Sequence, residues 1–365
     1  MNEIRIEGEV HTPVDFTGER EISFAVKSPF HHQLYLFLRE WFSQSPTLRL
    51  HTSGSTGKPK EITVRKEQML QSAKSTCDFF QLKKEDKALL CLPLEYIAGK
   101  MMVVRALYAG LDLYPVMPGG HPLAQTDIPF DFAAMIPLQV YNSLQLAEEK
   151  ERLSHIKYLI IGGGAIDKSL EATLKEFPNA IYSTYGMTET LSHIALRRIS
   201  GPAADSYYTP FPSVNLSLSR DNRLSIDAPL VADKPFITND IAEFRADGRF
   251  RIIGRSDNII NSGGIKIQIE EVELVLRPHI TGNFAVTSIP HPKLGEAMIL
   301  MIEQSNDPAY VENAIRQLLP RHRQPLLIHT AEAVPQTGNG KTDRAATKQL
   351  AKKINLSSST TRYIH

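Results

Sequence analysis

The sequence contains few cysteines. Only Cys77 and Cys91 occur among its 365 residues, and both lie in segments with an apolar pattern. Two cysteines are too few for a disulfide framework or a four-cysteine metal site, so we expect two buried free thiols. Such thiols are typical of a reducing compartment, and we therefore predict a cytoplasmic protein.

Long apolar runs and an excess of one charge are also absent. No stretch approaches the roughly 20 apolar residues of a membrane span, and the first ten residues lack the apolar core of a signal peptide. The 41 basic and 40 acidic residues leave a formal net charge of +1. This balance gives no general attraction to nucleic acid or to an anionic membrane, so we expect neither as a partner.

What is present is an alternation of short apolar strands and amphipathic helices. This pattern predicts an α/β fold, in which a large N-terminal domain has mixed sheets covered by helices. Residues 22–26 predict a strand, residues 137–148 a helix and residues 184–190 a turn. From Val214 to Phe250, short alternating segments separated by turns predict a small antiparallel subdomain.

The length of the chain exceeds that of a usual single domain, so we expect a second, smaller domain. A polar segment, 254–258, lies between two strand-like segments, and we place the boundary there. The predicted domains are residues 1–254 and residues 255–365, the second being a small α+β domain. Trp41 falls on the apolar side of a helical pattern and is expected in the core.

One loop combines hydroxyls, glycines and lysines in a way that suits a polyanion. Its glycines allow backbone N–H groups to turn toward an anion, and its lysines add positive charge. The loop is not the P-loop of NTPases, because Thr52 stands where the first glycine is required and Pro59 where the magnesium-binding hydroxyl is required. The alternative is a flexible surface loop. The loop consists of His51, Thr52, Ser53, Gly54, Ser55, Thr56, Gly57, Lys58, Pro59 and Lys60.

Two later segments can also form a nucleotide site. Gly162, Gly163, Gly164 and Ala165 follow a strand, which fits either a close approach to a flat ligand or a plain tight turn. Residues 184–190 join an aromatic ring, hydroxyls and the Glu189 carboxylate. A magnesium ion shared with phosphates needs only one or two such oxygen ligands from the protein.

Taken together, these motifs resemble those of the adenylate-forming superfamily of acyl-CoA synthetases, adenylation domains and luciferases. They occur in the order found in that family and extend over residues 51–344. The matching segments are residues 52–60, 185–189, 238–240, 254–257, 262–264 and 337–341.

The resemblance implies a role for each segment. The loop at 52–60 would hold the β- and γ-phosphates of ATP, Thr188 would contact the α-phosphate, and Glu189 would bind Mg²⁺. Lys341 would stabilise the charge that develops between the carboxylate and the α-phosphate. The ribose would bind Asp240 and Arg255, and the rest of the nucleotide site would comprise Gly162–Ala165, Tyr185, Gly186 and Met187.

The family reaction proceeds in two halves. A carboxylate attacks ATP to give an acyl-adenylate and pyrophosphate, and a thiol, here expected to be CoA, then displaces AMP. The resemblance implies a C-terminal domain that rotates between the halves about a hinge at Asp257. Gly263 and Gly264 would line the path of the thiol, and Lys266 would meet a CoA phosphate or form a surface salt bridge.

Within the superfamily, three phrases at 92–102, 135–140 and 186–193 resemble a compact form of the o-succinylbenzoate-CoA ligases of menaquinone biosynthesis. Their substrate carries two carboxylates, so that one is activated and the other anchored. Lys100 or Arg105 would anchor the second carboxylate, unless these residues form structural ion pairs. Tyr96 and His193 are the other expected substrate contacts, and the chain would be a monomer or a homodimer.

The sequence also departs from the family pattern. Tyr96 stands where many relatives have a histidine, Asn239 replaces a glycine, and only about fifty residues precede the phosphate loop, which implies an N-terminally trimmed domain. Other interpretations are a different aryl- or acyl-CoA synthetase, a stand-alone adenylation domain that loads a carrier protein, and an inert nucleotide-binding relative.

Overall fold

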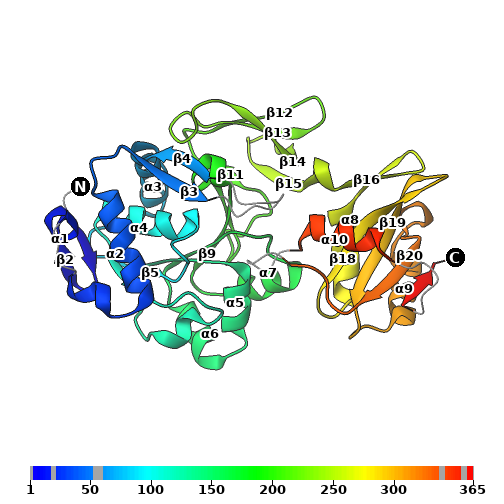
Figure 1. Ribbon diagram of the computed structural model, residues 1–365, viewed down its shortest axis with the longest axis horizontal. Helices are drawn as coiled ribbons and strands as arrows, with labels where there is room; N and C mark the ends of the chain where they lie inside the picture. Colours follow the sequence, from blue (N-terminus) through cyan, green and yellow to red (C-terminus); the bar gives the residue numbers. More distant parts are fainter. Residues whose placement is uncertain (1–2, 18–21, 52–60, 337–341, 355–359, 365) are drawn as a thin grey trace.

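The computed structural model in Figure 1 describes residues 3–17, 22–51, 61–336, 342–354 and 360–364. Within these residues the strands form three larger sheets and one separate hairpin. Helices lie between the strands and pack on the sheets (Figure 1). The predicted α/β class is therefore confirmed.

The largest sheet has a parallel centre and antiparallel edges. Its strands, in spatial order, are β11 (Thr209–Pro210), β10 (His193–Arg198), β9 (Ala180–Gly186), β8 (Tyr158–Ile161), β7 (Phe132–Met135), β5 (Lys87–Leu90), β6 (Asp112–Pro115), β1 (Ile4–Ile6) and β2 (Glu9–His11). The pairs from β9 through to β1 are parallel, whereas β2, β10 and β11 pair antiparallel.

The central strands read as continuous apolar runs because both faces of this sheet are covered. In β5, for example, Ala88 and Leu90 pack into one core and Leu89 into another. Trp41 and the free thiols of Cys77 and Cys91 are buried, as predicted. The helices of this part are α1 (Pro13–Thr17), α2 (Pro29–Trp41), α3 (Lys66–Phe80), α4 (Ile97–Ala109), α5 (Pro137–Leu144), α6 (Ala147–Ser154) and α7 (Lys168–Lys175).

Two smaller antiparallel units border the large sheet. β3 (Thr47–His51) and β4 (Glu61–Arg65) pair as a hairpin, and the predicted phosphate loop lies between them in the sequence. The other unit confirms the predicted antiparallel subdomain. It consists of β12 (Asn215–Leu218), β13 (Arg223–Asp227), β14 (Phe236–Phe244) and β15 (Phe250–Arg255).

The last sheet has a core of its own, and Figure 1 shows it to the right of the other two. It begins four residues after β15 ends, across the 3-10 turn η4 (Ser256–Asn258). Its strands are β16 (Ile259–Ser262), β17 (Ile265–Gln268), β18 (Phe284–His291), β19 (Gly295–Glu303), β20 (Leu327–Ala331) and β21 (Thr361–Tyr363), and its helices α8 (Ile269–Leu276), α9 (Pro308–Leu318) and α10 (Arg344–Lys352). In the described chain, no helix has both the length and the apolar character needed to cross a membrane.

Three local predictions were wrong. Residues 23–26 form a 3-10 turn rather than a strand, because the neighbours Phe24 and Ala25 are both buried while Val26 is 72% exposed. The helix predicted over 137–148 is two helices, α5 and α6, which break where Leu146 adopts an extended backbone. Finally, Tyr185 and Gly186 belong to β9, so the predicted turn is confined to the residues after them.

Candidate active site

The end of β9 presents two of the predicted nucleotide ligands. After Gly186 the chain forms the 3-10 turn η3 (Thr188–Thr190) and returns as β10. A Cβ on Gly186 would lie 2.3 Å from the carbonyl oxygen of Ser192, so the two strands can meet here only at a glycine. The buried Thr190 hydroxyl donates to the same carbonyl at 2.8 Å and holds the turn closed. Thr188 and Glu189 therefore occupy a fixed position at the tip.

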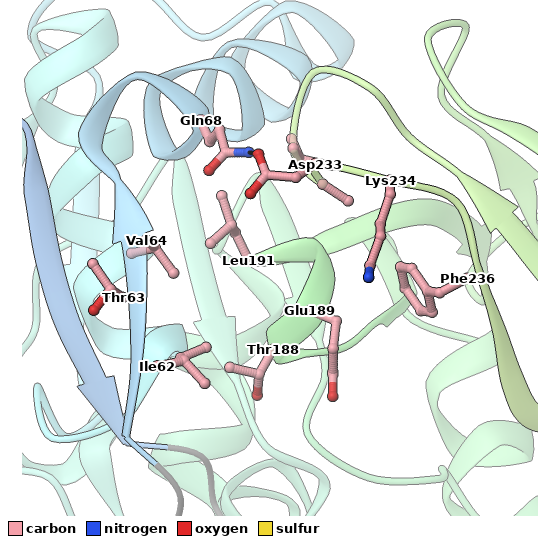
Figure 2. Close-up of a pocket in the computed structure, with 12 residues that line it drawn as sticks. Ile62, Thr63, Val64, Gln68, Thr188, Glu189, Leu191, Asp233, Lys234 and Phe236 are labelled. Atoms are coloured by element: carbon pink, nitrogen blue, oxygen red, sulfur yellow. Dashed lines mark hydrogen bonds between the residues drawn. The ribbon is translucent and has the colours of Figure 1, made fainter.

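These two residues line a cavity of about 320 Å³ (Figure 2). The cavity is bounded by β4, by η3 and by the segment 231–236 before and at the start of β14. Glu189 is exposed to solvent and has no hydrogen-bond or ion-pair partner among the described residues. An exposed, unpaired carboxylate of this kind fits a shared magnesium ion, which takes few ligands from the protein. The lining residues are Ile62, Thr63, Val64, Gln68, Thr188, Glu189, Leu191, Val231, Ala232, Asp233, Lys234 and Phe236.

Asp240 joins residues from three strands in one hydrogen-bonded network. Its Oδ2 accepts from the Tyr185 hydroxyl of β9 at 2.6 Å, and its Oδ1 accepts from Nη1 of Arg255 at 3.0 Å. Asp240 and Arg255 face each other in the register of β14 and β15. Arg255 also forms two hydrogen bonds to Asp257, at 2.9 and 2.7 Å, and the Asn239 amide donates to Asp257 at 3.1 Å. The structure thus brings the predicted ribose ligands and the predicted hinge residue together.

The charges of this network stabilise one another. The hydrogen bond to Asp257 and the nearby carboxylates raise the pKa of Arg255. Burial alone would raise the pKa of Asp257, but the hydrogen bonds and charge of Arg255 outweigh burial and lower it. Burial and the negative charge of Asp240 raise the pKa of Tyr185, so this hydroxyl keeps its proton and acts as a donor. Near pH 7, Arg255 and Asp257 are therefore charged and Tyr185 stays neutral.

A second polar cluster lies behind η3, within the core. Arg105 of α4 is 2% exposed, and its Nη2 donates to the Ser192 hydroxyl at 2.6 Å. The Ser192 hydroxyl is 3.3 Å from Nδ1 of His193, whose Nε2 is 3.1 Å from the Thr76 hydroxyl. The structure therefore brings together Arg105 and His193, two of the predicted substrate contacts, and places the partly exposed Ser192 between them.

Arg105 has no carboxylate partner in the part of the chain that the structure describes. Its other contact is to the sulfur of Met102 at 3.6 Å, and its buried Nε has no hydrogen-bond partner there. Burial lowers the pKa of Arg105 to about 10, and burial together with the charge of Arg105 lowers that of His193 well below its usual value. The cluster therefore holds a buried cation beside a neutral imidazole, surrounded by neutral groups.

The other two predicted substrate contacts lie elsewhere. Lys100 directs its ammonium toward the carbonyl of Arg49, at 3.4 Å, and over the ring of Phe37, at 5.8 Å. Burial lowers its pKa, although the charge of Glu40 opposes this. Lys100 lines a separate cavity of about 600 Å³ beside α2. Tyr96 precedes α4 and is 37% exposed.

The glycine turn after β8 contains one tight contact. A Cβ on Gly162 would lie 2.5 Å from the Thr184 hydroxyl, and Gly163 has a φ of +78°, so both positions favour glycine. Gly164 is half-buried and Ala165 is exposed. The close packing of Gly162 on β9 supports the tight-turn interpretation, and contact with adenine stays a prediction.

The predicted CoA contacts lie in the last sheet. Gly263 and Gly264 form the turn between β16 and β17, with φ values of +58° and +82°, and Lys266 is exposed on β17. Several predicted site residues lie outside the described residues, namely Thr52, Ser53, Gly54, Ser55, Thr56, Gly57, Lys58, Lys60 and Lys341.

Three residues near these sites were not among the predicted site residues. Ser192 binds the Arg105 guanidinium, and its place in the segment 186–193 was the signal that could have found it. Asn239 was noticed as a departure from the family glycine, and the structure shows its bond to Asp257. Lys234 lines the cavity of Thr188 and Glu189 but lies in a loop whose sequence suggests nothing.

The chain is similar to several known proteins. A 2-succinylbenzoate--CoA ligase from Salmonella typhimurium is 28% identical over 85% of this chain and 70% of that protein. The structure of an acyl-CoA synthetase (AMP-forming)/AMP-acid ligase II-like protein from Dyadobacter fermentans is 33% identical, with a TM-score of 0.61, over 89% of this chain and 95% of that chain.

An o-succinylbenzoate-CoA synthetase from Bacillus subtilis, solved with ATP and magnesium, shares the fold at 20% identity, with a TM-score of 0.69 over 81% of this chain and 68% of that chain. The family model described as AMP-binding enzyme matches residues 38–226, which is more than half of the 365 residues. The chain therefore belongs to the AMP-binding enzyme family.

Proposed function

We propose that the chain is an ATP-dependent o-succinylbenzoate-CoA ligase. In the first half-reaction, a carboxylate oxygen of the substrate forms a bond to the α-phosphorus of ATP, and the bond from this phosphorus to the bridging oxygen breaks to release pyrophosphate. In the second, the sulfur of CoA bonds to the acyl carbon and AMP leaves. The relative from Salmonella typhimurium, which carries that activity in its name, supports this proposal.

The observation that carries the choice of acid is the buried guanidinium of Arg105. An unpaired buried charge is costly, and a substrate carboxylate would supply the missing partner. Arg105 has no carboxylate among the described residues, whereas Lys100 already faces a carbonyl and an aromatic ring. We therefore assign the second carboxylate of the substrate to Arg105 and Ser192, with Lys100 outside the acid site.

The Asp240 network suits the ribose of the nucleotide. Its carboxylate is held in place by Tyr185 and Arg255 and can accept further hydrogen bonds from hydroxyl groups. Thr188 would donate to the α-phosphate. A magnesium ion, when bound, would neutralise phosphate charge, and Glu189 is the residue that would hold it. We keep Lys341 as the proposed cation at the reacting oxygens.

We also propose the division into residues 1–254 and 255–365, with Asp257 at the hinge. The separate core of the last sheet and the short turn η4 support it. Rotation of the second domain would bring Gly263 and Gly264 to the thiol of CoA. The bonds from Arg255 and Asn239 to Asp257 would then have to form and break as the domain moves.

The test is a substrate panel with the purified protein, ATP, Mg²⁺ and CoA. We expect pyrophosphate release and a CoA thioester with o-succinylbenzoate, and little turnover with benzoate or fatty acids. Turnover of benzoate or a fatty acid without turnover of o-succinylbenzoate would refute the proposal. Because a stand-alone adenylation domain that loads a carrier protein is the alternative, free CoA is an essential component of the assay.

A further inference from the structure

Lys234 lies in a position that no motif accounts for. It is exposed, and its side chain lines the same cavity as Thr188 and Glu189. Figure 2 shows its side chain pointing into the cavity, with the ammonium group near the base of the Glu189 side chain and the side-chain oxygens of Thr188 and Glu189 farther along. Three polar side chains from two segments, η3 and the loop before β14, therefore line one cavity.

The neighbouring charges leave this lysine available. Asp233, the adjacent residue, accepts from Nη2 of Arg65 at 2.7 Å and from Nε2 of Gln68 at 3.0 Å, and Figure 2 shows its carboxylate turned toward Gln68 and away from Lys234. Among the described residues, Lys234 forms no ion pair, including none with Glu189. The carboxylates of the lining are Asp233 and Glu189, and neither is paired with Lys234 among the described residues.

The cavity is also next to the predicted phosphate loop in the chain. Ile62, Thr63 and Val64 of β4, which form one wall, follow that loop directly. An anion bound beside Thr188 and Glu189 would share this cavity with Lys234. A lysine ammonium is suited to this role because it acts as a mobile point charge with three donors.

We propose that Lys234 binds the β- and γ-phosphates of ATP and stabilises the departing pyrophosphate. This inference rests on the proposed function and adds a residue to its first half-reaction. As the bond from the α-phosphorus to the bridging oxygen breaks, the electron pair of that bond remains on the pyrophosphate. A cation at this position compensates the charge that the leaving group gains. Lys234 has no such role in the second half-reaction, because AMP carries neither phosphate.

The test compares Lys234→Met and Lys234→Arg with the matched control Lys150→Met, an exposed lysine of α6 outside the cavity. We expect Lys234→Met to slow adenylation and to weaken inhibition by inorganic pyrophosphate, each by about 10-fold to 100-fold, the usual effect of losing a charge-assisted hydrogen bond. Lys234→Arg should retain most of the adenylation rate and most of the inhibition by pyrophosphate. Formation of the thioester from supplied acyl-adenylate and CoA should match wild type in all three variants.

Two results would overturn the inference. One is unchanged pyrophosphate inhibition and adenylation in Lys234→Met, and the other is an equal loss in the thioester-forming half, which would indicate a general structural defect. Direct titration of the protein with inorganic pyrophosphate and Mg²⁺ measures pyrophosphate binding without any acid. It therefore tests the role of Lys234 independently of the proposed ligase activity. If no acid were activated, the proposed function would fail, yet weaker pyrophosphate binding by Lys234→Met would still support the role of Lys234.

Discussion

Asp240 and Arg105 are both buried charged side chains, but their surroundings differ. Asp240 accepts hydrogen bonds from Tyr185 and from Arg255. Arg105 contacts a hydroxyl and a thioether and has no anion among the described residues. The region around Asp240 therefore compensates its own charge before a ligand binds, whereas the region around Arg105 leaves the compensation to a ligand. The region around Asp240 suits a nucleotide, which every reaction of the family uses. The region around Arg105 suits an acid with a second carboxylate, which only some substrates have.

The largest effect should follow from breaking the compensated region. Asp240→Ala leaves Arg255 without one of its acceptors and Tyr185 without its own. We expect the free energy of unfolding to fall by roughly 2–3 kcal/mol and kcat/KM for ATP by about 1,000-fold, since two charge-assisted bonds are lost. Denaturant unfolding and ATP-dependent pyrophosphate release measure both. Wild-type stability in this variant would contradict the comparison.

Arg105→Met tests the uncompensated region and should have the opposite effect on folding. Replacing an unpaired buried cation by an apolar side chain of similar length is often neutral or stabilising. We expect the melting temperature to stay level or rise, while kcat/KM for o-succinylbenzoate falls by about 100-fold and the KM for ATP is unchanged. A marked loss of stability would mean that Arg105 is a structural residue.

The pH dependence of acid binding offers a smaller test. Because burial lowers the pKa of Arg105 to about 10, the folded protein loses this proton at lower pH than the unfolded chain does. Between about 10 and the usual value of 12.5, this residue's contribution to stability therefore rises with pH while its attraction for a carboxylate disappears. We expect the affinity for o-succinylbenzoate to fall several-fold as pH approaches and passes about 10 in wild type, measured by calorimetry, and to stay level in Arg105→Met.

The smallest effect should come from the edge of the compensated region. Asn239→Gly removes the bond to Asp257 and restores the residue typical of the family. Asp257 keeps both bonds to Arg255, so we expect stability to change by less than about 1 kcal/mol and each half-reaction by less than about threefold. Separate assays of adenylation and thioester formation would detect a larger, unequal change, which would show that Asn239 controls the hinge.

The sequence predicted the α/β class and the antiparallel subdomain because the patterns behind them are local. Buried parallel strands such as β5 read as apolar runs, and the short alternating segments after Val214 form the sheet of β12 to β15. The wrong predictions occurred where the spacing of apolar residues does not match their burial. Residues 22–26 have a strand-like period, yet burial follows the adjacent pair Phe24 and Ala25, and only tertiary packing decides this.

The candidate site was predictable to the extent that its residues belong to motifs. The motifs predicted two ribose ligands, Asp240 and Arg255, and the hinge residue Asp257. The hydrogen bonds among them depend on the register of β14 and β15, which the motifs do not give. The choice between Lys100 and Arg105 also required structure, since both lie on α4 and only their burial and partners differ. Lys234 was not predicted because it lies in an irregular loop without a motif. Only the structure shows that it lines the same cavity as Thr188 and Glu189.

The Tyr185–Asp240–Arg255 contacts also set a limit on how many ligand groups Asp240 can take. A carboxylate offers about four lone-pair positions. Within the described residues, Tyr185 and Arg255 each occupy one. About two positions therefore remain, which equals the number of hydroxyl groups on the 2′ and 3′ carbons of a ribose. By this count, if Asp240 binds the ribose as proposed, a deoxyribonucleotide would leave one acceptor position vacant, and the two protein donors that fix the carboxylate would also let it distinguish the two sugars.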